Sequence, residues 1–232
     1  MKGFDKVEFL LDTANIEEIK HLNDCLPLSG VTTNPSIIKK EGKIDFFHHM
    51  KEIRKIIGFN KTLHVQVVAT DYEGMVKDAE AILENIDEEI YIKIPVTKEG
   101  LKAIRELKSR NVNVTATAIY TKAQAYLAIA SGADYIAPYY NRMEKLDIDP
   151  KDNIRSMANL IKQYDSQTRI LAASFKNIGQ VNTAFEIGAQ AATISADILE
   201  ESLSIPSVIK AVNDFKADWE NIYGEHSTII DY

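Results

Sequence analysis

The strongest constraint on the fold of this chain is an alternation of two hydrophobic periods along its sequence. Short apolar runs rich in branched residues, typical of buried strands, occur eight times with a mean spacing of about 26 residues. The predicted strands are residues 7–11, 28–32, 63–68, 90–95, 112–118, 135–138, 170–173 and 191–194. One strand and one helix fit into each interval of this length, so the sequence predicts eight strand–helix units.

The segments between these runs have the period of helices. Apolar residues are spaced by three and four positions, as in Phe46, Met50, Ile53 and Ile57. A last helix is predicted at about residues 206–222, with a proline in its first turn and a glycine after its end. Residues suited to helix N-caps precede several segments, and a glycine suited to a C-cap follows one of them. These are Asp71, Thr97, Thr121 and Asn177 for the N-caps and Gly188 for the C-cap.

Eight such units with nearly continuous apolar strands predict an α/β fold, a closed (β/α)8 TIM barrel. We expect a single barrel domain over residues 1–232, with the extra C-terminal helix and a short polar tail. The main alternative is an open doubly wound sheet. It is less favoured because no glycine-rich phosphate-binding turn follows the first strand.

Composition narrows the class of protein further. There are 27 Lys and Arg against 34 Asp and Glu, a net charge of −7, which argues against nucleic acid or an anionic membrane as a partner. The one cysteine, Cys25, allows no internal disulfide and is expected to be a small packed residue, and the five histidines lack metal-binding spacing, so no metal site is expected. No apolar run is long enough to cross a bilayer and the opening segment does not resemble a signal peptide, so we expect a cytoplasmic protein.

Polar residues interrupt or follow the predicted strands near their C-terminal ends. In a barrel of parallel strands these ends meet on one face, and the chemistry collects there. The candidate residues are Asp12, Thr33, Asn34, Gln66, Lys93, Thr117, Tyr139, Arg142, Ser174, Lys176, Ser195 and Asp197.

Lys93 is the most unusual of these residues, because it interrupts an otherwise apolar run at residues 90–96. Burying an ammonium group costs several kcal/mol unless the group is paired or neutralised. One interpretation is therefore a structural ion pair with Asp12. The other is a lysine whose pKa is lowered by desolvation, which supplies a neutral amine that can attack a ketone and form a Schiff base.

The remaining candidates also have structural explanations. Asp12 and Ser174 could each cap a helix, and Asn34 precedes Pro35 as in an ordinary turn or helix start. Tyr139 could pack with its hydroxyl group on a backbone carbonyl. Arg142 and Lys176 could be solvated, or they could form an anion site together with Ser174 near the start of a helix.

Five ordered motifs resemble the transaldolase family, and more narrowly its small branch, which contains fructose-6-phosphate aldolase. The motifs are LDTAN at 11–15, GVTTNPSI at 30–37, IKIPVT at 92–97, APY with NR at 137–142, and AASFK at 172–176. FKADW at 215–219 in the last helix extends the resemblance almost to the end of the chain.

The resemblance implies a (β/α)8 barrel and a class I aldolase with its Schiff-base lysine at Lys93. It implies that Asp12 and Asn34 contact substrate hydroxyl groups and assist proton transfer, with Thr33 beside them. Gln66, Thr117 and Tyr139 would hold or replace the catalytic water. Arg142, Ser174 and Lys176 would bind the sugar phosphate. No cofactor and no metal are implied.

The same resemblance suggests the reaction and the assembly. The larger transaldolases usually have Glu where this chain has Gln66 and Phe where it has Tyr139, so we expect cleavage of fructose 6-phosphate into dihydroxyacetone and glyceraldehyde 3-phosphate. A transaldolase, a pyridoxal-phosphate enzyme and a non-catalytic sugar-phosphate-binding barrel remain as alternatives. The family implies a homo-oligomer, a pentamer or decamer, whose last helix packs on its own barrel or reaches a neighbouring subunit.

Overall fold

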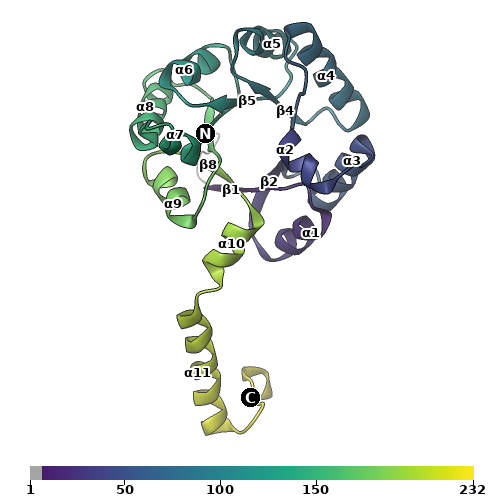
Figure 1. The fold of residues 1–232 in the computed structure, drawn as a ribbon. Coiled ribbons are helices and arrows are strands. Elements are labelled where there is room, and N and C mark those ends of the chain that lie inside the picture. Colours follow the sequence, from purple (N-terminus) through teal and green to yellow (C-terminus); the bar gives the residue numbers. More distant parts are fainter. Residues whose placement is uncertain (1–6) are drawn as a thin grey trace. The chain divides into compact units, whose positions relative to one another are not determined.

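Eight parallel strands pair in the order in which they occur along the chain, and β8 pairs with β1, so the sheet closes into a barrel (Figure 1). The computed structural model describes residues 7–232; the first six residues of the predicted domain lie outside the described part. The strands are β1 (Glu8–Asp12), β2 (Leu28–Thr32), β3 (Thr62–Gln66), β4 (Tyr91–Pro95), β5 (Val114–Ile119), β6 (Tyr135–Pro138), β7 (Arg169–Ala172) and β8 (Ala191–Ile194). The predicted TIM barrel is confirmed, with all eight strands within two residues of their predicted bounds.

Helices follow the strands along the chain, and those that precede β8 surround the barrel in Figure 1. They are α1 (Ile16–Cys25), α2 (Pro35–Ile38), η1 (Lys39–Glu41), α3 (Phe46–Ile57), α4 (Tyr72–Asn85), α5 (Lys98–Ser109), α6 (Lys122–Ala130), α7 (Tyr140–Lys145), α8 (Pro150–Gln163) and α9 (Ile178–Glu186), and then α10 (Ala196–Leu203), α11 (Pro206–Tyr223) and η2 (Ile229–Asp231). Side chains cap α4, α5, α6 and α9 at the four predicted positions, Asp71, Thr97, Thr121 and Asn177. Gly188 lies one residue beyond the C-cap of α9, with a φ of 113°, a conformation that glycine adopts without strain.

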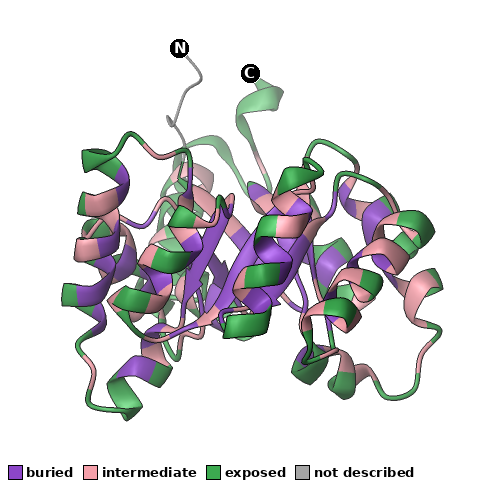
Figure 2. Cartoon of the chain, turned by 90° about the horizontal axis from the view of Figure 1, so that it is seen from above, coloured by how far each residue is buried: buried purple, intermediate pink, exposed green. Residues whose placement is uncertain are grey.

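The core lies on both sides of the strands. Figure 2 shows the strands buried and the outer faces of the helices exposed. Inside the barrel, Leu10, Tyr135, Leu171 and Ala191 form a buried layer, and Tyr91 packs against it. This layer fills the barrel below the polar strand ends. The strand ends therefore line a cavity with a closed bottom and not a pore through the barrel.

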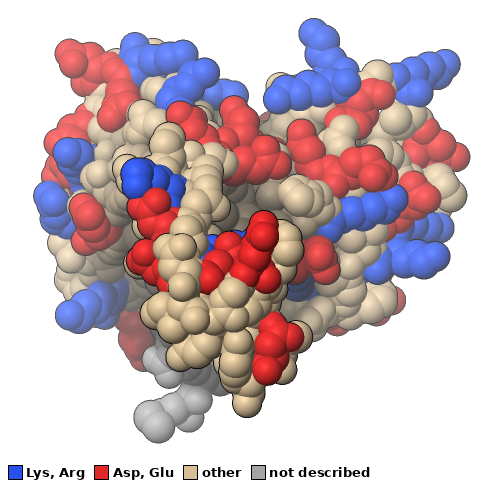
Figure 3. Space-filling view, turned by 90° about the horizontal axis from the view of Figure 1, so that it is seen from below, with Lys and Arg blue, Asp and Glu red and all other residues tan. Residues whose placement is uncertain are grey.

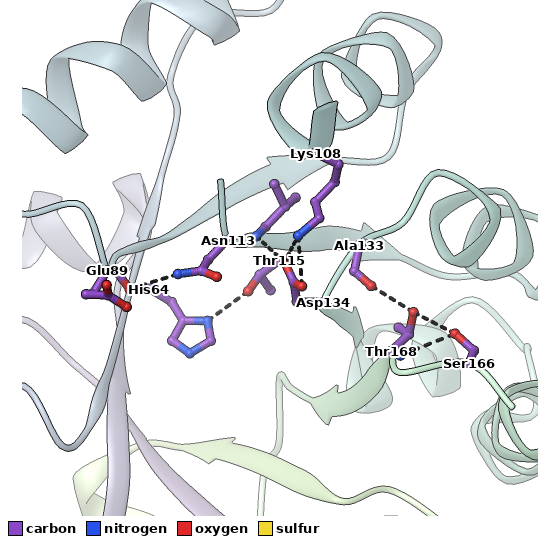
Figure 4. Close-up of polar contacts among 10 residues, drawn as sticks. His64, Glu89, Lys108, Asn113, Thr115, Ala133, Asp134, Ser166 and Thr168 are labelled. Atoms are coloured by element: carbon purple, nitrogen blue, oxygen red, sulfur yellow. Dashed lines mark hydrogen bonds and ion pairs between the residues drawn. The ribbon is translucent and has the colours of Figure 1, made fainter. Parts of the chain in front are cut away.

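A buried histidine belongs to the same interior. His64 on β3 is completely buried, and its ring stacks on that of Tyr91 with centroids 4.7 Å apart. Its Nδ1 lies 2.8 Å from the hydroxyl oxygen of Thr115 (Figure 4), and its Nε2 lies 3.0 Å from that of Thr62. Burial lowers the pKa of His64 well below its usual value, so the ring is neutral and uses one nitrogen as donor and the other as acceptor.

Side-chain bonds to the backbone fix the beginnings of three consecutive strands (Figure 4). The carboxylate of Asp134, before β6, accepts the N–H of Val114 at 2.7 Å and pairs with Lys108 at the end of α5. Before β7, the hydroxyl group of Thr168 donates to the carbonyl of Ala133 at 2.7 Å. These bonds satisfy backbone groups that the strand ladders leave unpaired, and they set the relative heights of β5, β6 and β7.

Two sequence predictions about packing are wrong. Cys25 was expected to be a small packed residue, but it is exposed at the end of α1, with its thiol directed to the carbonyl of His21 at 3.3 Å. Val68 was expected to end the third strand, but β3 ends at Gln66 and Val68 is 72% exposed. The backbone N–H of Val67 still donates to the carbonyl of Lys93 at 3.1 Å, but the next two N–H groups, of Val68 and Ala69, donate to the carboxylate of Asp78 instead of to the neighbouring strand.

The chain divides into two compact units, one that extends to Ala196 and one of Asp197–Tyr232. In the second unit, α11 covers the predicted C-terminal helix, with its proline in the first turn and Gly224 as C-cap. None of its residues is buried. Its apolar stripe is exposed at Val208, Val212, Phe215 and Ile222.

The surface carries charges of both signs. Lysine, arginine, aspartate and glutamate side chains are spread over the face shown in Figure 3, and no broad area of that face, in its described part, carries one sign alone. Among residues 7–232, no helix is both long enough and apolar enough to cross a bilayer.

Candidate active site

A cavity of about 200 Å³ opens at the C-terminal ends of the strands. It brings together side chains from both halves of the barrel sequence, as expected for a closed parallel sheet. Seven of the residues predicted from the sequence line it: Asp12, Asn34, Lys93, Thr117, Tyr139, Arg142 and Ser174.

Lys93 lies in the middle of β4 between two fully buried isoleucines and is only 4% exposed. Its Nζ donates a hydrogen bond of 2.8 Å to the backbone carbonyl of Thr33. In the described chain it forms no ion pair with Asp12, so the structural ion pair that the sequence allowed is absent. Burial lowers the pKa of Lys93, and the negative charge of Asp12 opposes only part of this effect. A larger fraction of this amine is therefore neutral and nucleophilic at pH 7 than for an ordinary lysine.

The segment after β4 helps to hold Lys93 in place. Thr97 caps α5 by accepting the backbone N–H of Gly100 at 3.0 Å. A Cβ atom at Gly100 would lie 1.9 Å from the carbonyl oxygen of Pro95, so only glycine lets α5 start so close to the end of β4. The C-terminal end of the strand that carries the amine is thus fixed by the next helix.

Asp12 ends β1 and is oriented by a chain of hydroxyl groups. The hydroxyl of Thr32 donates to its carboxylate at 2.6 Å, and the hydroxyl of Thr193 lies 2.6 Å from that of Thr32. Because Thr32 has one proton and gives it to Asp12, Thr193 must donate to Thr32. Asp12 does not cap α1, since Asn15 does so by accepting two backbone N–H groups. The helix-cap interpretation of Asp12 is therefore wrong.

Tyr139 follows β6, and its hydroxyl lies 3.0 Å from that of Thr117 on β5. The structural explanation of Tyr139 predicted that its hydroxyl group would contact a backbone carbonyl. Its partner is instead the side chain of Thr117. Burial raises the pKa of Tyr139, so the phenol keeps its proton at neutral pH. Its ring contacts two neighbours: the ring of Tyr120 packs edge-on at a centroid distance of 5.6 Å, and the Arg142 guanidinium lies 4.7 Å from its centroid.

Two of the predicted residues lie beside the cavity but are not part of its lining. Gln66 is the register partner of Lys93 in the adjacent strand, and its Oε1 is buried with no hydrogen-bond donor in the described chain. A buried acceptor of this kind is usually satisfied by a bound molecule such as water. Thr33 is 1% exposed, and its hydroxyl donates to the carbonyl of His64 at 3.3 Å. Its contribution to the cavity is the carbonyl that receives the amine of Lys93.

Asn34 has a structural role and also lines the cavity. Its Oδ1 accepts the backbone N–H groups of Ser36 and Ile37 and caps α2. The cap fixes which side of the amide carries the oxygen, so the amide N–H groups stay available as donors. The interpretation of Asn34 as a helix start is thus confirmed, and it is compatible with contact to a substrate hydroxyl group.

Arg142 and Ser174 bring anion-binding groups to the other side of the cavity. Arg142 Nη1 donates to the hydroxyl of Tyr120 at 3.2 Å, which holds the guanidinium over Tyr139. Ser174 has a φ of 64°, a conformation that is uncommon for a residue with a side chain and is often found at functional sites. It does not cap α9, because Asn177 does.

Lys176 was predicted with these two residues, but the structure does not place it in the cavity lining. It is exposed at the start of α9, where its backbone N–H donates to the side chain of Gln180 at 2.7 Å. The other seven lining residues were not among the candidates from the sequence: Ser36, Ile37, Lys40, Ala137, Leu171, Ala173 and Thr193. Strand alternation could have found Thr193, which lies two residues before Ser195, whereas no strand-end signal marks Lys40. Among residues 7–232, no three His, Cys, Asp or Glu side chains gather to hold a metal ion.

Fold and cavity together define a class of protein: a (β/α)8 barrel with a desolvated lysine at its mouth, surrounded by carboxylate, hydroxyl and guanidinium groups. The family model described as Transaldolase/Fructose-6-phosphate aldolase matches residues 9–227. The chain belongs to this transaldolase/fructose-6-phosphate aldolase family.

Individual relatives agree with the family. A protein of Streptococcus pneumoniae (strain ATCC 700669 / Spain 23F-1) named "Probable fructose-6-phosphate aldolase" is 51% identical over 221 residues, which cover 95% of this chain and all of that protein. A "Probable transaldolase" of Clostridioides difficile (strain 630) is 36% identical over 214 residues, 92% of this chain and 97% of the relative. A solved structure of dihydrodipicolinate synthase from Rhodopseudomonas palustris matches with a TM-score of 0.60 at 12% identity, over 83% of this chain and 71% of the other. That last likeness concerns the fold alone.

Proposed function

We propose that this chain is a class I aldolase that cleaves fructose 6-phosphate into dihydroxyacetone and glyceraldehyde 3-phosphate, and forms it in the reverse direction, through a Schiff base on Lys93. The observation that carries the proposal is the amine of Lys93, which is buried at the mouth of the barrel without a carboxylate partner and has a lowered pKa. The 51% identity to a probable fructose-6-phosphate aldolase supports the choice of reaction.

The reaction begins when the neutral amine of Lys93 adds to C2 of the open-chain ketose. The resulting carbinolamine loses its C2 hydroxyl group as water, and an iminium ion forms. Asp12, held by Thr32, and the amide of Asn34 line the same cavity and are suited to hydrogen bonds with the hydroxyl groups of the sugar. The iminium withdraws electrons from C3, so the role of an electron sink is filled without a metal.

Cleavage needs a base for the proton of the C4 hydroxyl group. The phenol of Tyr139 keeps its own proton, because burial raises its pKa, so we assign the proton to a water molecule. We assign the binding of this water to Gln66 Oε1, a buried acceptor without a donor in the described chain, and to the hydroxyl of Thr117. As the proton leaves, the C3–C4 bond breaks, its electron pair forms an enamine on Lys93, and glyceraldehyde 3-phosphate departs.

The fate of the enamine separates two activities. In an aldolase, a proton is added at C3, and hydrolysis of the new iminium releases dihydroxyacetone and restores Lys93. In a transaldolase, the enamine attacks an aldose phosphate such as erythrose 4-phosphate. A protonated phenol beside the cavity favours the first route, and for this reason we assign the aldolase activity. The 36% identity to a probable transaldolase keeps transfer as the second candidate.

At the phosphate end of the substrate, we assign binding to Arg142 and Ser174, which line the cavity together. An arginine can contact two phosphate oxygens at once, and the cation of Arg142 is already oriented by Tyr120 and Tyr139. We also propose a homo-oligomer, a pentamer or decamer, and a cytoplasmic location.

The test is the release of glyceraldehyde 3-phosphate from fructose 6-phosphate, measured with and without erythrose 4-phosphate. Sustained release without the acceptor is expected for the aldolase. Release that depends on the acceptor would assign the transaldolase activity. Borohydride reduction in the presence of dihydroxyacetone should attach the three-carbon unit covalently to Lys93, and mass spectrometry should find none on a Lys93→Met variant. If wild-type protein binds fructose 6-phosphate and is never trapped, the chain is a non-catalytic sugar-phosphate-binding barrel.

A further inference from the structure

A second cation lines the cavity and has no role in the mechanism above. Lys40 belongs to η1, the short 3-10 turn that follows β2 and α2, and its side chain contributes to the same lining as Arg142. It is exposed, and within the described residues it takes part in no hydrogen bond or ion pair. Its charge is therefore not paired with a carboxylate of residues 7–232.

The strand order of the barrel shows from which side the ammonium group of Lys40 reaches the cavity. In a closed ring of eight strands, β2 and β6 are four positions apart, on opposite sides of the barrel. Lys40 follows β2 and Arg142 follows β6, while Lys93 on β4 lies a quarter of the ring from each. Both are long side chains that line one small cavity, so their charges converge on it from opposite sides.

The charge balance of the cavity defines the ligand. Asp12 is the one acidic side chain in the described lining, against Lys40, Arg142 and the partly neutral Lys93. This positive excess is local, because the whole chain has a net charge of −7. A phosphate monoester carries between one and two negative charges near pH 7, more than one guanidinium group neutralises. A flexible ammonium group adds a point charge to the fork of an arginine without requiring a fixed geometry.

We propose that Lys40 is a second contact for the phosphate group of the substrate, opposite Arg142, and that it makes the enzyme select phosphorylated aldehydes over neutral ones. The inference rests on the proposed aldolase function and deepens its specificity. It also supplies the second cation that the sequence placed at Lys176, a residue that the structure keeps out of the lining.

The chain contains a matched control for this proposal. Lys39 is adjacent to Lys40, is also exposed, belongs to the same turn and is not part of the cavity lining. Lys39→Met and Lys40→Met remove the same charge from nearly the same place. A long-range electrostatic effect on substrate capture would act on both variants, whereas loss of a direct contact would act on Lys40→Met alone.

The experiment compares two aldehydes that differ only in the phosphate group. Aldol formation from dihydroxyacetone is measured with glyceraldehyde 3-phosphate and with D-glyceraldehyde, and the ratio of their kcat/KM values is taken for each protein. Loss of a charge-assisted hydrogen bond should lower this ratio about tenfold in Lys40→Met. In Lys39→Met the ratio should stay within about twofold of the wild-type value.

Two results would overturn the inference. One is an unchanged ratio in Lys40→Met, which includes an equal loss of kcat/KM for both aldehydes, and the other is the same fall of the ratio in both variants. Borohydride trapping of dihydroxyacetone distinguishes failure of the proposed role of Lys40 from failure of the proposed aldolase function. Dihydroxyacetone carries no phosphate, so its trapping on Lys93 does not depend on a phosphate contact. If wild-type protein is not trapped, the aldolase function fails. If wild-type and both variants are trapped and the ratios are equal, only the role of Lys40 fails.

Discussion

Replacing Lys93 with methionine tests whether its amine is a buried reagent or a structural element. The side chain is 4% exposed and makes one hydrogen bond, from Nζ to the carbonyl of Thr33. Methionine has a similar length and removes both the charge and the donor. If the amine serves chemistry, the Lys93→Met variant should lose turnover completely and keep its fold.

The expected change in stability is the balance of two effects. Loss of a hydrogen bond from a charged donor costs about 1.5–3 kcal/mol. Against this, the variant is relieved of the cost of burying an unpaired charge, which amounts to about 1.4 kcal/mol at pH 7 for each unit by which the pKa of Lys93 is lowered. We therefore expect the free energy of unfolding of the variant to lie within about 2 kcal/mol of the wild-type value. For a chain of this length, that is a shift in Tm of less than about 8 °C.

The pH dependence of this difference has a definite sign. Because the pKa of Lys93 is lower in the folded state than in the unfolded state, the unfolded wild-type protein binds more protons between these two values. Wild-type stability relative to the variant must then increase as the pH rises through this window toward 10.5. Urea unfolding of both proteins at pH 7 and pH 10 measures it.

Two results would refute this reasoning. If the variant is destabilised by more than about 3 kcal/mol at pH 7, the amine of Lys93 is a structural group whose loss leaves an unpaired buried partner. If the difference between the two proteins does not move in favour of wild type at pH 10, the pKa of the amine is not lowered by burial. Retained cleavage of fructose 6-phosphate would exclude the Schiff base itself.

Three further substitutions test neighbouring parts of the site. Tyr139→Phe should lower the kcat for cleavage about 100-fold and raise the share of enamine captured by erythrose 4-phosphate; an unchanged partition would exclude the phenol as the proton donor. Tyr120→Phe removes the hydroxyl that holds Arg142 and should raise the KM for fructose 6-phosphate about fivefold at nearly constant kcat, whereas a fall in kcat alone would contradict a role in phosphate binding. Thr32→Val should lower kcat about tenfold and the free energy of unfolding by about 1–2 kcal/mol, since Asp12 loses its donor, and normal turnover would show that this bond is not needed.

Local signals in the sequence were sufficient to predict the barrel. Branched apolar runs define strands because each strand is buried on both faces, and Thr97 and Asn177 mark helix starts because their side chains satisfy backbone N–H groups that no other group reaches. Strand ends were predicted less well where a distant side chain competes for the backbone. Asp78 does so after β3, and this contact is invisible in the sequence around Val68.

The site could be predicted as far as it follows from strand ends. A closed parallel sheet brings these ends together. Asp12 and Lys93 were therefore expected to line the same end of the barrel, although they are far apart in the sequence. The argument failed for Lys176, because the turn after β7 and the cap of α9 carry that side chain to the surface. It also missed Lys40, which reaches the cavity from a 3-10 turn.

The orientation of Asp12 shows what local reasoning cannot supply. Asp12 and Asn15 are both good cap residues, and the sequence does not say which of them caps α1. The choice is made by Thr32 and Thr193, whose hydroxyl groups reach Asp12 only because β8, β1 and β2 are neighbours in the closed sheet. The hydrogen bonds of Asp12 are thus set by the register of three strands that lie far apart along the chain.

The same dependence holds for the reactivity of Lys93. An apolar strand does not by itself desolvate a lysine at its centre, because water could reach the amine through the barrel. The layer of Leu10, Tyr135 and Leu171 closes the interior, and His64 fills a place there as a neutral ring. A charged His64 would place a second cation near Lys93 and would have to be desolvated as well. The lowered pKa of Lys93 therefore belongs to the packed interior of the barrel, and β4 alone does not produce it.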